Sequence, residues 1–176
     1  MQSGSMAYSK RHGLQLTFIA WLSMLGLDFL LHAGLLAGLY LQPSPFLLPP
    51  VTALALIPVG YLSFLLLAVL LVWLMRRLKL AGWRAGAIFG LELGGLTWGS
   101  FVLGLLSIST ASFSLLLGWF VGQTLELAIA GAVVGSGLAG MRLGRLFGVV
   151  MVFVLLAVIT TIILQSLGVV PSTRIS

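Results

Sequence analysis

Five long apolar stretches account for most of this chain, and they limit its possible folds more than any other feature. They cover residues 14–40, 51–75, 83–107, 113–140 and 146–167. A transmembrane helix needs about 20 mainly apolar residues, and each stretch is long enough. Only 7% of the residues are charged, which is too few to cover a soluble globule of this size with a polar surface. The sequence therefore predicts an all-α, five-helix transmembrane bundle.

The segments outside these spans are short. We expect a polar N-terminal tail at 1–13, a membrane domain at 14–167 and a C-terminal tail at 168–176. None of the connections is long enough for a soluble domain. The lipid bilayer is therefore the first expected partner, and we expect a multi-pass membrane protein.

Basic residues predict the direction in which the chain crosses the membrane. Eight of the nine lie before the first span, between the second and third, or between the fourth and fifth, and Arg174 is the exception. Loops rich in Lys and Arg stay in the cytoplasm. This distribution predicts a cytoplasmic N-terminus and an external C-terminus, with every copy inserted in the same direction.

All three acidic residues of the protein, Asp28, Glu92 and Glu126, lie inside predicted spans. A charged side chain at the centre of a bilayer costs about 2.5–3.5 kcal/mol, so such residues usually face the interior of a bundle. His32 follows Asp28 by one helical turn, and Gln123 precedes Glu126 on nearly the same face. We expect these five residues to form a polar core, or to bind protons or a cation.

Small residues at four-residue intervals mark the expected helix contacts, because they let helix backbones approach closely in lipid. One row lies on the third span and another on the fourth, on the face that carries Glu126. A further pair, Gly95 and Gly99, shares a face of the third span with Glu92. We therefore expect the third span to be central, in a core with the first and fourth, and flanked by the second and fifth. The residues of the two rows are Gly86, Gly90 and Gly94, and Gly118 and Gly122.

The acidic residues have two interpretations, and the sequence leaves both open. In the first, each is a structural group that forms hydrogen bonds with Gln, Thr, Ser or backbone carbonyls of a neighbouring helix. In the second, the Asp28–His32 pair and Glu126 bind H⁺ or a cation, with Glu92 as a relay toward the cytoplasm.

Several activities are excluded by composition and spacing. The chain has no cysteine, so thiolate metal sites and cysteine nucleophiles are absent. It has one aspartate, no His-Glu-x-x-His motif and no pair of histidines at ligand spacing. We therefore expect no enzyme, no metal site and no cofactor. The basic residues form no patch interleaved with aromatic residues, so we expect no nucleic-acid partner.

Two short segments resemble small prokaryotic multi-pass membrane proteins of unknown function. They are Leu27-Asp28-Phe29, which leads to Leu39-Tyr40, and Gly86-Ala87-Ile88-Phe89-Gly90-Leu91. The similar families have a comparable size and also carry acidic residues within helices. The resemblance implies a prokaryotic membrane setting, which we expect to be the bacterial cytoplasmic membrane (the cell inner membrane), and it assigns no activity. This chain differs from those families in its fifth span and in Glu126.

Two functions follow as expectations. The first is a non-enzymatic accessory or structural subunit, or an assembly factor, whose glycine-lined faces contact other membrane subunits. The alternative is a small proton- or cation-linked transporter that uses the intramembrane carboxylates. Since five helices enclose little space, we expect a homo-oligomer in the second case.

Overall fold

The chain folds into a bundle of long helices in a computed structural model that describes residues 10–42 and 44–171. Most of the predicted N-terminal tail, and residues 172–176 with Arg174, lie outside this range. The helices are α1 (Lys10–Asp28), a π-helix η1 (Phe29–Leu35), α2 (Ala37–Tyr40), α3 (Pro50–Arg77), α4 (Trp83–Ile108), α5 (Phe113–Leu138) and α6 (Leu143–Ser166). Among these described residues, five helical segments are long and apolar enough to span a membrane, the first of them being α1 together with η1. The predicted all-α, five-helix architecture is confirmed.

The centre of the bundle is formed by α1 and α5. Helix α1 packs against α3, α5 and α6, and α5 packs against α1, α4 and, over a shorter length, α3. Their shared core consists of large apolar side chains such as Leu16, Met24, Leu71 and Leu127, none of which is exposed. The two central helices also carry most of the polar residues discussed below. The fold therefore places the polar residues of α1 and α5 against each other.

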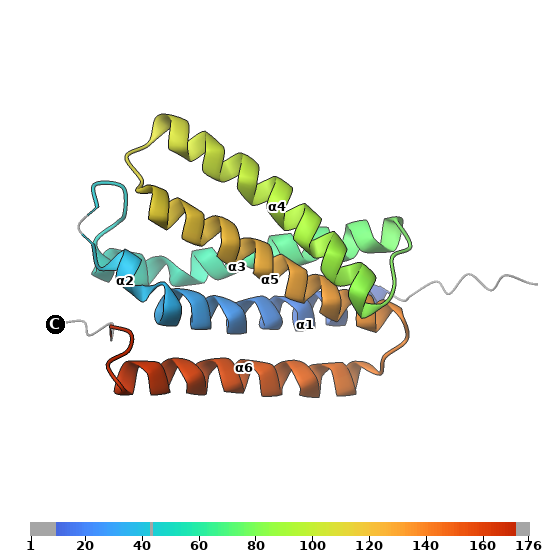
Figure 1. The fold of residues 1–176 in the computed structure, drawn as a ribbon. Helices are drawn as coiled ribbons and strands as arrows, with labels where there is room; N and C mark the ends of the chain where they lie inside the picture. Colours follow the sequence, from blue (N-terminus) through green and yellow to red (C-terminus); the bar gives the residue numbers. More distant parts are fainter. Residues whose placement is uncertain (1–9, 43, 172–176) are drawn as a thin grey trace, which may run out of the picture.

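The expectation that the third span is central is wrong. Helix α4 packs chiefly on α5 and lies at the edge of the bundle, where it diverges from α5 toward its C-terminal end (Figure 1). Its buried residues are three glycines on the face toward α5. On the other face, a side chain at Gly95 would meet no atom within 4 Å, and Gly99 touches only the ring of Phe120. One glycine row is therefore filled by the backbone of α5, while the other meets only the Phe120 ring of α5 at Gly99 and open space at Gly95.

Backbone contact between α4 and α5 depends on glycine. A β-carbon at Gly86 would collide with the carbonyl of Gly131, and one at Gly90 would collide with the carbonyl of Leu127. Gly82, which has a φ of +97°, donates its N–H to the carbonyl of Gly135 at 2.8 Å and docks the turn before α4 onto α5. Small residues at this spacing are the main packing device of helices in lipid.

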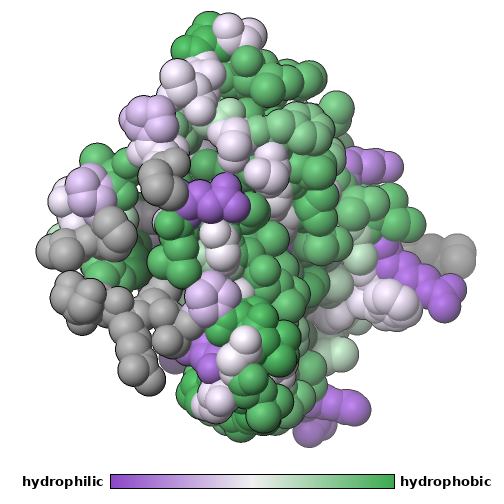
Figure 2. Space-filling view, turned by 60° about the vertical axis from the view of Figure 1, so that its left-hand side comes forward, coloured by the Kyte–Doolittle hydropathy of each residue, from purple (hydrophilic) through white to green (hydrophobic). Residues whose placement is uncertain are grey.

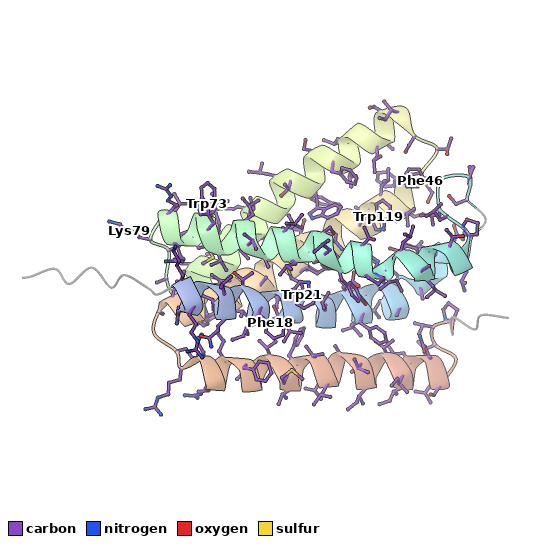
Figure 3. All side chains as sticks on the ribbon, turned by 180° about the vertical axis from the view of Figure 1, so that it is seen from behind. Phe18, Trp21, Phe46, Trp73, Lys79 and Trp119 are labelled. Atoms are coloured by element: carbon purple, nitrogen blue, oxygen red, sulfur yellow. The ribbon has the colours of Figure 1, made fainter. Side chains whose placement is uncertain are left out.

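The surface and the ends of the bundle fit a membrane setting. Hydrophobic residues cover much of the face seen in Figure 2. At one end, Trp73 and Lys79 lie close to the turn between α3 and α4 (Figure 3), and the Arg77 guanidinium lies 5.8 Å from the Trp73 ring centroid. Aromatic and basic side chains of this kind are typical of membrane interfaces. The α5–α6 turn, with Arg142, lies at the same end (Figure 1).

Candidate functional site

A polar cluster lies between the C-terminal half of the first span and the middle of α5. Asp28 is the last residue of α1, and His32 lies in the π-helix that follows. A π-helix has a wider turn than an α-helix and is found frequently at functional sites. Gly122 allows this wide turn to approach α5, because its α-carbon faces Leu31 and His32 with no side chain between them. The local widening therefore brings His32 next to α5.

Three candidate ligand side chains meet in this cluster. His32 Nε2 lies 3.5 Å from Asp28 Oδ1 and 3.9 Å from Glu126 Oε1. Gln123 connects the two helices, since its Nε2 donates to Glu126 Oε1 at 3.0 Å and lies 3.4 Å from His32 Nε2. Four of the five polar residues singled out in the sequence therefore form one site.

Two aromatic residues extend the cluster toward the loop between α2 and α3. The Tyr40 hydroxyl forms a hydrogen bond with His32 Nδ1 and accepts one from Trp119 Nε1 at 2.7 Å. Trp119 also lies against Phe46 of that loop, with ring centroids 6.0 Å apart (Figure 3). Sequence reasoning missed both roles, because Trp119 and Tyr40 lie on separate helices and the π-helical turn between His32 and Tyr40 has no sequence signal. Their position within apolar spans was the only available signal.

Glu126 is the most deeply buried member of the cluster. Its side chain has no exposed surface, whereas Asp28 and His32 retain 15% and 18% exposure. Within the described part of the chain, Glu126 Oε2 and Gln123 Oε1 have no hydrogen-bond partner. Buried oxygens of this kind usually have a donor or a cation as partner. The site therefore has two buried acceptor oxygens to which no surrounding side chain donates a hydrogen bond.

A cavity of about 440 Å³ gives access to the cluster. Asp28, His32 and Gln123 form its polar side, while aromatic side chains from α2, α3, α4 and α5 form the rest. The aromatic residues are Tyr40, Phe64, Trp98, Phe101 and Trp119. The divergence of α4 from α5 leaves this space open, and Glu126 lies behind the other polar residues. A small ion that enters the cavity would therefore meet Asp28 and His32 first.

Glu92 does not join the cluster. It is exposed on α4, on the face opposite the glycines that contact α5. Helix α4 turns this carboxyl away from Asp28 and Glu126, so the geometry gives the relay role expected for Glu92 no support. Among the glycines, Gly86, Gly90 and Gly94 contact α5 itself, Gly118 lies against Leu36 and Leu39, and Gly122 lies against His32.

The arrangement offers one imidazole nitrogen and two carboxylate oxygens to a common centre. One ligand atom each from Asp28, His32 and Glu126 lies within 4.8 Å of the others. Such a group can hold a proton shared between carboxyl and imidazole groups, or coordinate a metal ion. The expectation of no metal site rests on the spacing of residues along the chain, and that spacing does not reveal contacts between separate helices.

Comparisons with protein-family models, with curated proteins and with solved structures find no match to this chain. The resemblance of its first and third spans to small prokaryotic proteins gains no support from them. The fold and the apolar surface define the class of protein. They are those of an all-α bundle compatible with a multi-pass membrane protein.

Proposed function

We propose that this protein is a small membrane transporter linked to a proton or a cation, which binds at Asp28, His32 and Glu126. The observation that carries the proposal is the convergence of these three side chains inside the bundle, beside an open cavity. Ionisable residues within membrane spans typically mark ion pathways and coupling sites. Midplane sites between helices, with a broken or irregular helix at the site, are typical of transporters.

The site has an order of access. Asp28 and His32 line the cavity, and Gln123 holds Glu126 behind them through its amide. An ion therefore reaches the cavity-lining pair Asp28 and His32 first and the buried carboxyl of Glu126 second. With the N-terminus in the cytoplasm of a bacterial cell, as the basic residues indicate, this cavity opens in the outer half of the membrane. Release to the cytoplasm then requires α1 and α5 to move relative to each other.

Ion flux into liposomes that contain the purified protein tests this function. We expect Glu126→Gln to lower the flux of the coupling ion at least tenfold, because the amide keeps the shape of the side chain and removes its charge. The matched control is Glu92→Gln, which makes the same change on the exposed face of α4 and should leave the flux unaltered. Equal flux in the Glu126→Gln variant and in the unaltered protein would remove the cluster from any coupling role.

An accessory subunit remains a second candidate, supported by a separate observation. Helix α4 is the least hydrophobic of the five spans and has the fewest buried residues, and it exposes Glu92 beside the open Gly95. This face suits another membrane helix, either of a second copy or of another subunit. Gly86 and Gly90 already contact α5, so Gly95→Leu is the substitution that tests docking of another helix.

The mass of the particle extracted gently from native membranes tests this second candidate. A stoichiometric partner subunit that is lost in the Gly95→Leu variant would support docking through α4. A partner retained in that variant, or recovery of the protein as a single chain, would count against it.

A further inference from the structure

We propose that the ion bound at Asp28, His32 and Glu126 is a divalent transition-metal cation. This inference rests on the proposed transport function and names the class of ion. It stands on the identity of the ligand atoms, on their separations, on the partner of the second histidine nitrogen, and on the two buried oxygens without partners.

The identity of the ligands favours a transition metal over a hard cation. The three side chains offer one imidazole nitrogen and two carboxylate oxygens. Zinc and its first-row neighbours bind such mixed sets, whereas magnesium and calcium prefer oxygen ligands alone. Two carboxylates also carry the charge that a divalent cation balances, which leaves the site neutral inside the bilayer.

The separations between the ligand atoms are close to those that a tetrahedral metal requires. A metal about 2.1 Å from each ligand places neighbouring ligand atoms about 3.4 Å apart. The separation from His32 Nε2 is 3.5 Å to Asp28 Oδ1 and 3.9 Å to Glu126 Oε1. Because no pair exceeds 4.8 Å, small side-chain rotations are enough to close the site around an ion.

The second nitrogen of His32 has the partner that a metal-binding histidine needs. Ligating histidines usually donate their other N–H to an oxygen, which holds the ring in place. Here Nδ1 lies against the Tyr40 hydroxyl, and Trp119 Nε1 donates to that same oxygen. With a metal bound, this oxygen would use its second lone pair to accept from His32 Nδ1–H, and the Nε2 lone pair would be available to the ion.

The two unpartnered oxygens provide an independent indication. Gln123 is 5% exposed and Glu126 not at all, yet Gln123 Oε1 and Glu126 Oε2 have no donor among the described residues. An ionised carboxylate oxygen and an amide oxygen only accept, so a donor or a cation would satisfy them. The Gln123 amide now directs Nε2 at His32 and Glu126, and a flip of this amide would offer Oε1 as a fourth ligand.

Binding of Zn²⁺ and Co²⁺ to the full-length protein in detergent tests the proposal without any transport assay. We expect one Co²⁺ per chain, with the intense visible absorption of a tetrahedral ion, displaced by an equimolar amount of Zn²⁺ and retained in a thousandfold excess of Mg²⁺. The spectrum is measured on the unaltered protein, so it does not depend on the folding of a variant. Absence of a saturable Co²⁺ signal would overturn the metal assignment.

Variants then locate the site. His32→Gln should abolish the Co²⁺ absorption, and Tyr40→Phe should weaken Zn²⁺ binding about 10- to 100-fold, as removal of an outer-shell partner typically does. Glu92→Gln is the control, since this carboxyl lies outside the cluster, and it should bind as the unaltered protein does. Unchanged Co²⁺ absorption in the His32→Gln variant would place the metal elsewhere and refute the proposal.

The failure of this inference is distinguishable from the failure of the proposed function. Ion flux that depends on Glu126, without saturable Zn²⁺ or Co²⁺ binding, would refute the metal assignment and leave the transport function standing. One tightly bound metal per chain with no flux of any ion tested would refute transport and leave the metal site standing.

Discussion

At the scale of single residues, the presence or absence of one β-carbon decides how closely α4 and α5 approach. The glycines that face α5 lie in direct contact with its backbone, while Gly95, the residue after Gly94, faces open space. Glycines of one helix therefore have opposite tolerance to the same substitution.

Gly90→Ala should destabilise the protein by about 1–3 kcal/mol, because the added methyl group collides with the carbonyl of Leu127 and forces the two helices apart. Gly95→Ala is the matched control and should be neutral or slightly stabilising, since alanine favours a helix more than glycine does. Thermal unfolding in detergent, followed by circular dichroism, measures both. Equal melting temperatures for the two variants would contradict the contact.

Tyr40→Phe should lower the free energy of unfolding by about 1–3 kcal/mol. The substitution leaves His32 Nδ1 and Trp119 Nε1 without the hydroxyl that joins them, and a buried polar group that loses its partner is costly. Tyr61→Phe is the control, because no hydrogen bond of its hydroxyl is found among residues 10–42 and 44–171. A Tyr40→Phe protein as stable as the control would show that the hydrogen bonds contribute nothing.

The residues of the site were predictable, and their meeting was not. Spacing along one helix identified the Asp28–His32 pair and the Gln123–Glu126 pair, because neighbours one turn apart share a face. Spacing does not tell which faces of two helices meet. For the same reason Glu92, also an acid inside an apolar span, was placed with the others although it lies on the far side of α4.

At the scale of elements, a side-chain cap fixes the start of α5. Ser112 caps α5, since its hydroxyl oxygen accepts from the N–H of Leu115 at 3.3 Å. This cap holds the start of the helix that carries Trp119, Gln123 and Glu126. The stability of the first turn of α5 therefore contributes to the geometry of the cluster.

Ser112→Ala should cost about 0.5–2 kcal/mol of stability, the usual effect of removing an N-cap hydroxyl. Ser107→Ala is a suitable control, because that hydroxyl donates to the carbonyl of Gly104 within its own helix and caps nothing. Chemical unfolding of both variants in the same detergent measures the difference. A loss of stability in the Ser107→Ala variant as large as that in the Ser112→Ala variant would show that the cap does not stabilise α5.

At the scale of the whole molecule, the number of helices followed from the sequence and their arrangement did not. Hydropathy and length are sufficient to recognise five spans. The third span carries small residues on two faces, and nothing in the sequence tells which face finds a neighbour within the chain. The structure fills one face with α5 and leaves the other at the edge of the bundle.

The orientation of the bundle is tested by labelling single cysteines, since the natural chain has none. Lys79→Cys lies in the α3–α4 turn and Thr110→Cys in the α4–α5 turn, at opposite ends of the molecule (Figure 1). A membrane-impermeant maleimide should label Thr110→Cys in intact cells, and Lys79→Cys only after permeabilisation, because the basic loops are expected in the cytoplasm. The reverse pattern would invert the proposed topology.

The widened turn at Phe29–Leu35 has an evolutionary consequence. An α-helix becomes a π-helix locally when one residue is inserted, while the helix on either side keeps its register. A gene that gained one codon here would acquire the His32 position in a single event, without rebuilding the bundle around it. The length of the segment between Asp28 and Tyr40 therefore determines whether His32 faces α5.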